Sequence, residues 1–70
     1  MRKVEITREP VELYKILKFE GLVTTGGEAK LLIADGQVTV NGEIETRRRK
    51  KIVNGDVIEF SGEKLQMQLV

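Results

Sequence analysis

The chain has 70 residues with no cysteine and no histidine, and its twelve cations and eleven anions leave a net charge of +1. This length predicts a single domain over residues 1–70 with a small aliphatic core, and the composition excludes disulfides and thiolate or imidazole metal sites. No apolar run approaches the roughly 18 residues of a membrane span and no signal-peptide pattern opens the chain, which favours a cytoplasmic protein.

The first two predicted elements are a strand and a helix. Val4 and Ile6 alternate with polar residues, which is the period of a half-buried strand. A helix is predicted over about 10–20, because apolar residues recur at helical spacing after Pro10 and because Gly21 can end it. The aromatic residues are all expected in the core; they are Tyr14, Phe19 and Phe60.

A second helix is predicted over about 26–35. Thr25 and Glu28 fit the capping box, in which the threonine accepts from the amide of Glu28 and the glutamate reaches back. Ala29, Leu32 and Ile33 then recur at helical spacing. The helix should end at Asp35-Gly36, because glycine readily adopts the left-handed conformation that follows a helix.

A hairpin follows this helix. Val38 and Val40 alternate with polar residues, and Asn41-Gly42 is typical of a turn. A two-residue turn would put Ile44 on the opposite face from the two valines. We favour a three-residue loop or a bulge, which would return Ile44 to the core side.

Two more strands complete the predicted fold. Val57–Phe60 follows a turn at Asn54-Gly55-Asp56, and a last strand follows Ser61-Gly62, with Leu65, Met67 and Leu69 alternating. The sequence therefore predicts an α+β fold, with two short helices packed on a small, mostly antiparallel sheet of four or five strands.

The chemistry of the side chains argues against an enzyme. The commonest general base and the strongest nucleophile are both missing, and the single serine, Ser61, lies in a predicted turn. A chain this short would also have difficulty enclosing a substrate pocket. We therefore expect no catalysis and no cofactor or metal.

Arg47–Lys51, hereafter the basic run, places five cations side by side with no anion between them. One interpretation is a solvated face. The other is a site for a polyanion, which would relieve the repulsion among the five charges. If the run is extended in phase with a buried Ile52, then Arg48 and Lys50 share the side of Ile52, and the other three cations project from the opposite side.

The start of the second helix offers a related site. Gly26 and Gly27 are either ordinary first-turn residues or bare amides that can accept a phosphate, and Lys30 adds a cation one turn further on. Arginine favours phosphate, and no aromatic platform for single-stranded bases is expected. These features point to backbone and shape recognition of structured nucleic acid.

Leu22–Phe60 resembles the S-four RNA-binding domain, the αL module named after a small-subunit ribosomal protein. The resemblance rests on the capped second helix with Glu28-Ala29-Lys30, on Val38-Thr39-Val40-Asn41-Gly42, and on the later Gly55-Asp56-Val57-Ile58. With the first helix, the motif core covers about residues 11–60. Small free-standing bacterial members are the most similar type.

This resemblance implies binding to structured RNA, ribosomal or transfer, and to ribosomal particles that contain it, through the second helix and the adjoining hairpin. Larger members often carry basic residues where Gly26 and Thr39 stand, so the basic run supplies the charge here. The candidate RNA-binding residues are Thr25, Gly26, Gly27, Lys30, Gln37, Thr39, Asn41, Arg47, Arg48, Arg49, Lys50 and Lys51.

Two alternatives to RNA binding remain open. One is a protein-interaction adaptor of a small β-grasp type, and the other is a binder of duplex DNA, although no helix carries the cations and amides of a recognition helix. An exposed sheet edge beside like charges disfavours strand-to-strand pairing, so a monomer is expected.

Overall fold

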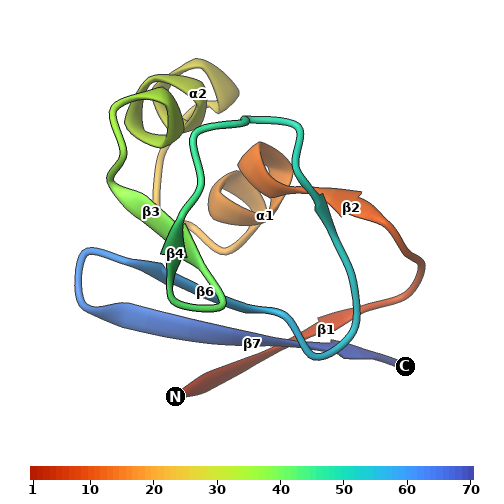
Figure 1. Cartoon of the computed structure of the whole chain (residues 1–70). Coiled ribbons are helices and arrows are strands. Elements are labelled where there is room, and N and C mark those ends of the chain that lie inside the picture. Colours follow the sequence, from red (N-terminus) through yellow and green to blue (C-terminus); the bar gives the residue numbers. More distant parts are fainter.

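The computed structural model describes residues 1–70 as two helices and seven strands (Figure 1). Five strands form one sheet in the order β1-β7-β6-β3-β4, while β2 and β5 pair separately. β1 runs parallel to β7 and the other neighbours are antiparallel, which confirms the predicted α+β architecture. The elements are β1 (Arg2–Ile6), β2 (Val11–Glu12), α1 (Leu13–Phe19), α2 (Gly26–Ala34), β3 (Val38–Val40), β4 (Glu43–Ile44), β5 (Lys51–Ile52), β6 (Val57–Phe60) and β7 (Glu63–Leu69).

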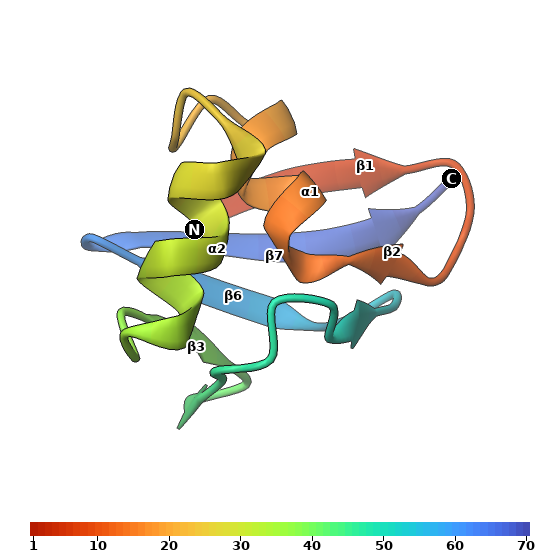
Figure 2. The same cartoon turned by 90° about the horizontal axis from the view of Figure 1, so that it is seen from above.

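Both helices cover the same face of the five-stranded sheet (Figures 1 and 2). Fourteen residues are buried between the two layers, and all of them are hydrophobic. Because strand side chains alternate between faces, the intervening residues of the strands lie on the uncovered face of the sheet. The largest fully buried side chains are Leu13, Leu17, Ile33, Val38, Ile52, Ile58, Leu65 and Met67.

α1 begins at Leu13, so the predicted start near Pro10 was wrong. Val11–Glu12 is extended and pairs antiparallel with Lys51–Ile52. The apolar spacing before Leu13 is equally compatible with this short strand, and a long-range pairing decided between the two. The same pairing brings the end of the basic run next to the start of α1.

Both helices end at a glycine, as predicted. Gly21 and Gly36 have φ angles of +74° and +82°, which glycine adopts without strain. At the end of α1 the amide of Leu22 donates to the carbonyl of Leu17 at 3.0 Å, and this contact closes the helix. Neither helix combines the length and apolar character needed to cross a lipid bilayer.

The hairpin turn has two residues, so the favoured three-residue loop or bulge was wrong. Asn41 and Gly42 both have positive φ, +54° and +85°, as the commonest two-residue hairpin turn requires. Ile44 therefore lies directly opposite Thr39 and is 68% exposed. The geometry of the turn, rather than the burial of one more aliphatic side chain, sets the register.

The prediction that all aromatic residues lie in the core was wrong at Phe19. Tyr14 and Phe60 are half-buried against the core, whereas Phe19 is 70% exposed. α1 spans only seven residues, and Phe19 is its last one. Its side chain falls outside the buried stripe and lines a pocket shared with residues of β1.

Candidate nucleic-acid interface

The start of α2 is fixed by side chains, as predicted. Thr25 Oγ1 accepts a hydrogen bond of 3.1 Å from the amide of Glu28. The carboxylate of Glu28 reaches back one residue further than in a regular capping box, and it accepts from the amide and the hydroxyl of Thr24 at 2.9 and 3.1 Å. The amides of Gly26 and Gly27 lie in the first turn, where they have no partner within the helix.

Tyr14 connects the start of α2 to the basic run. A Cβ atom at Gly26 would lie 3.7 Å from the Tyr14 ring, so the ring packs against this glycine. Lys30 Nζ lies 4.7 Å from the ring centroid, in the geometry of a cation–π contact. The amide of Tyr14 donates to the carbonyl of Arg48 at 3.1 Å. Tyr14 therefore contacts both predicted parts of the site, the start of α2 and the basic run.

The basic run crosses the start of α1 as a turn (Figure 2). The amide of Lys50 donates to the carbonyl of Arg47 at 3.1 Å, and the first two amides of α1 donate to the carbonyls of Lys50 and Arg48 at 2.9 and 3.1 Å. Glu12, the N-cap residue just before α1, makes no side-chain capping hydrogen bond, so the basic run satisfies these amides instead. Because Arg48 and Arg49 form the turn, the predicted two-sided alternation of the five cations was wrong.

Carboxylates within the chain neutralise two of the five cations. Arg47 binds Glu45 through two contacts, Nε to Oε2 at 2.9 Å and an Nη to Oε1 at 3.2 Å. This hydrogen-bonded guanidinium lowers the pKa of the Glu45 carboxyl below its ordinary value of 4.5, and Glu45 in turn raises the pKa of Arg47. Arg49 Nε lies 3.7 Å from a carboxylate oxygen of Glu12, which also pairs with Lys15.

The other three cations, Arg48, Lys50 and Lys51, make no ion pair with a carboxylate of the chain. Lys50 and Lys51 line a cleft of about 440 Å³ between the basic run and the β3–β4 hairpin. These three side chains therefore carry the charge that a polyanion can reach without breaking an ion pair.

Of three further candidate residues, Gln37 and Thr39 lie apart from this cluster, whereas Asn41 lines the same cleft as Lys50 and Lys51. Gln37 follows the other end of α2, where its side-chain amide donates to the carboxylate of Asp35 at 2.9 Å. Thr39 lies on the uncovered face of the sheet, and its hydroxyl is buried without a hydrogen-bond partner. Asn41 uses both ends of its side-chain amide inside the fold, donating to Asp56 at 3.0 Å and accepting from the amide of Val57 at 2.9 Å.

Sequence reasoning missed Tyr14 and Lys15 as members of this surface. Tyr14 was assigned to the core because it falls next to an apolar stripe, and its half-burial only partly fits that assignment. Lys15 Nζ lies 6.0 Å from the same ring and pairs with Glu12 at 3.4 Å. The sequence spacing of Glu12 and Lys15, three residues apart, could have indicated their pairing on a helix surface.

No group of three or more histidine, cysteine, aspartate or glutamate side chains is arranged to hold a metal ion. The arrangement offers cations, helix amides and one aromatic ring, but no nucleophile with an adjacent base. Its chemistry is that of anion binding.

Comparison with known families agrees with this chemistry. A family model described as "S4 domain" matches residues 4–68. The "Putative RNA-binding protein YbcJ" of Escherichia coli (strain K12) is 49% identical over 57 residues, which cover 81% of each chain. The "Probable ribosome maturation protein RlbA" of Bacillus subtilis (strain 168) is 36% identical over 59 residues, covering 84% of this chain and 83% of that protein.

A solved structure shares the fold as well. The solution structure of YbcJ from E. coli, reported as revealing an αL motif involved in RNA binding, matches with a TM-score of 0.73 and 42% sequence identity. The match covers 97% of this chain and 87% of that chain.

Proposed function

The chain belongs to the S4 domain family and has the αL RNA-binding fold, and from this premise we propose that it is a non-catalytic cytoplasmic protein that binds structured RNA through the start of α2 and the basic run. The family resemblance in the sequence is confirmed by the S4 domain match and by the E. coli relative, which is named as a "Putative RNA-binding protein". The proposed binding unit corresponds to the motif core, residues 11–60.

The contact of Tyr14 with both halves of the site carries the proposal. It puts Lys30 and the amides of Gly26 and Gly27 on the same side of the fold as the basic run, whose backbone carbonyls accept from the first amides of α1. Cations and unpaired helix amides at fixed spacing suit a row of phosphates, because a phosphate accepts from both. A flexible charged tail would not hold such spacing.

Structured RNA fits this surface better than a single strand. Recognition of single-stranded bases requires aromatic side chains on which bases stack, and the one ring at this site is already covered by Lys30. Ribosomal RNA is the first ligand to test, because the B. subtilis relative is named as a ribosome maturation protein, and transfer RNA is the second.

The proposed surface can be tested by amide chemical-shift mapping of the ¹⁵N-labelled protein during titration with a structured ribosomal RNA fragment at two salt concentrations. We expect shifts at residues 25–30 and 46–51 that weaken with salt. With about five or six phosphate contacts, the logarithm of the affinity should fall with the logarithm of salt concentration with a slope of about −4 to −5. Unshifted amides in both segments of a folded protein would refute the proposal.

A matched pair of variants separates the basic run from general surface charge. Arg48→Gln should weaken RNA binding about five- to tenfold and make the salt slope shallower by about 1, because one phosphate contact is lost. Lys64→Gln removes a cation on β7 that is also exposed and unpaired, and it should leave both quantities unchanged. Duplex DNA of the same length should compete weakly, and equal competition would favour a duplex DNA binder.

A further inference from the structure

The β1 strand is an edge of the five-stranded sheet and pairs with β7 only. The carbonyl of Ile6 faces β7, since it accepts from the amide of Val70 at 2.9 Å. Backbone groups alternate in direction along a strand, so those of Lys3 and Glu5 point away from β7. This row of free amides and carbonyls can pair with another strand.

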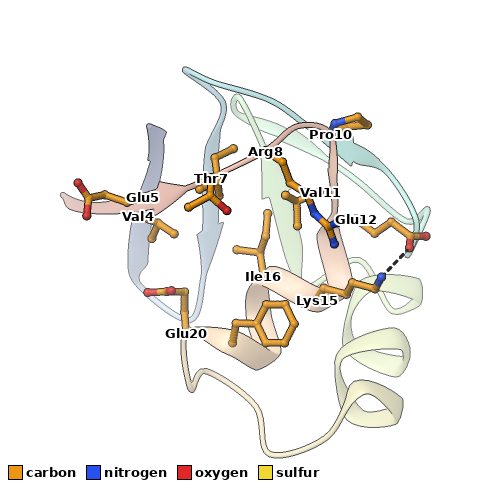
Figure 3. Close-up of a pocket in the computed structure, with 12 residues that line it drawn as sticks. Val4, Glu5, Thr7, Arg8, Pro10, Val11, Glu12, Lys15, Ile16 and Glu20 are labelled. Carbon is orange, nitrogen blue, oxygen red and sulfur yellow. Dashed lines mark ion pairs between the residues drawn. The ribbon is translucent and has the colours of Figure 1, made fainter. Parts of the chain in front are cut away.

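A groove of about 710 Å³ runs between β1 and α1 (Figure 3). Its apolar surface includes Val4 and Ile6 of β1 and Ile16 of α1, and Figure 3 shows Val4 and Ile16 on facing sides of it. The groove also reaches Phe19, which is 70% exposed. Because Val4, Ile6 and Ile16 are buried, Phe19 supplies the exposed apolar surface beside the free edge.

The charges on the β1 edge of one copy are complementary to those on the same edge of a second copy. Lys3 and Glu5 are both exposed and neither makes an ion pair within the chain. When two copies of Arg2–Ile6 lie antiparallel with the Val4 residues opposite each other, Lys3 lies opposite Glu5 of the partner subunit, and Glu5 lies opposite Lys3 of the partner subunit. Directly opposed opposite charges stabilise a strand pair.

We propose that the β1 edge is a homodimer interface, in which two copies pair antiparallel about a two-fold axis at Val4. In this register the outward backbone groups of Lys3 meet those of the partner's Glu5, which is the hydrogen-bonded type of antiparallel pair. The two five-stranded sheets join into one, and the exposed Phe19, which lines the groove beside β1, faces the partner subunit.

A second copy of the chain fits this edge because the pattern is isologous: the same five residues supply both sides of the contact. The expectation of a monomer rested on like charges beside a sheet edge, and those charges follow β4. β4 is the opposite edge of the sheet, and the alternating charges of β1 carry no such repulsion. The dimer also leaves the basic run accessible to RNA.

The interface is small, so the dimer should be weak. Two five-residue strands with one aromatic side chain each bury less than a standard stable interface, and we expect a Kd on the order of 100 µM. Sedimentation equilibrium of the full chain between about 10 µM and 1 mM measures it at concentrations that bracket this value.

Charge reversal tests the register directly. Lys3→Glu alone and Glu5→Lys alone should each weaken self-association at least about tenfold, because each puts like charges opposite each other twice. An equimolar mixture of the two variants should form a heterodimer with wild-type affinity, since every cross-strand pair is then opposite in charge. Glu63→Lys, an exposed charge reversal on β7 away from the edge, should dimerise like the wild type.

Two results would overturn the proposal. The first is a wild-type chain that stays monomeric up to about 1 mM, which would leave this edge to an extended segment of a different protein. The second is a mixture of the two charge-reversed variants that forms no heterodimer. Neither measurement involves RNA, so they are independent of the proposed function.

Discussion

At the scale of single residues, ion pairs with carboxylates should determine which cations of the basic run can bind RNA. Glu45 holds Arg47 through two hydrogen bonds, so this arginine can bind a phosphate only by leaving its partner. Glu45→Gln removes the competing charge and should raise RNA affinity about three- to tenfold and steepen the salt slope by about 1. Fluorescence anisotropy at four salt concentrations measures both.

The matched control for this change is Glu43→Gln. Glu43 lines the same cleft as Glu45 but makes no ion pair, so its substitution removes a negative charge without releasing an arginine. We expect a smaller rise in affinity. Equal gains from the two variants would mean that only the net charge of the surface matters.

The ion pair between Glu45 and Arg47 makes a pH-dependent contribution to the free energy of unfolding. The pKa of Glu45 is lower in the folded chain than its ordinary value of 4.5, because Arg47 hydrogen-bonds to the ionised carboxylate. A depressed folded pKa means that the stabilisation is complete above the unfolded pKa and is lost as the pH falls through the folded pKa. A carboxyl NMR titration should give a midpoint below 4.5 for Glu45, and Arg47→Gln should raise that midpoint.

We expect Asn41 to contribute to the stability of the fold rather than to RNA affinity. Its side-chain amide donates to Asp56 and accepts from the backbone amide of Val57. Its φ of +54° is one that asparagine tolerates better than alanine. Asn41→Ala should therefore cost about 2–3 kcal/mol of unfolding free energy, measured by urea denaturation. RNA affinity, corrected for the folded fraction, should stay within about twofold; a larger loss would restore Asn41 as a contact.

At the scale of elements, two substitutions at the start of α2 separate helix stability from phosphate binding. Gly27→Ala should raise the unfolding free energy by about 0.5 kcal/mol, since alanine favours the helix and its Cβ meets only Thr25 Oγ1 at 3.9 Å. If the first-turn amides bind a phosphate, the added methyl group hinders its approach, and RNA affinity should fall about threefold.

Thr25→Ala provides the opposite case. It removes the acceptor for the amide of Glu28 and should cost about 1 kcal/mol, with Thr25→Ser close to the wild type. Urea denaturation and RNA titration of the same samples give both quantities. Stability and affinity that rise together for Gly27→Ala would show that the amides act only in the helix.

The elements that the sequence predicted well depend on neighbours in the chain. The Thr25 cap and the glycine ends of both helices involve residues within five positions of each other, so a local pattern contains the whole interaction. β2 was missed because its two residues are extended only through pairing with β5, far along the chain. Ile44 was misplaced because turn geometry, not apolar pattern, sets the hairpin register.

The distinction between local and long-range contacts also applies to the candidate site. The basic run and the glycines of α2 are recognisable from residue type alone. Their proximity depends on Tyr14, whose contacts reach Gly26 and Arg48 across the fold, and no sequence window contains all three. The pairing of Arg49 with Glu12 is also a product of the tertiary structure, so the sequence could not distinguish the free cations from the paired ones.

At the scale of the whole molecule, the hydrophobic core and the proposed RNA surface depend on some of the same residues. The basic run has no regular structure of its own beyond its last residue, and its shape comes from the amides of α1 and from Ile52, the residue that follows it in β5. Ile52 is fully buried in the same core as the sheet residues. A loss of packing at Ile52 should therefore also disturb the proposed RNA surface.

Ile52→Ala tests this coupling against Ile58→Ala, which deletes the same atoms from another fully buried position, on β6. Both should cost about 2–5 kcal/mol of unfolding free energy. Only Ile52→Ala releases the end of the basic run, so it alone should weaken RNA binding per folded molecule, by about fivefold or more.

Positions 52 and 58 can still be compared if the alanine variants unfold. Ile52→Val and Ile58→Val should each lower the unfolding free energy by only about 0.5–1.5 kcal/mol. Bound RNA stabilises the folded state by about 2.7 kcal/mol at a hundred times its Kd, so thermal melts with and without RNA report affinity and stability together. Equal RNA-induced shifts for the position 52 and position 58 variants would mean that the basic run keeps its shape without Ile52, and that the contacts to α1 alone position the cations.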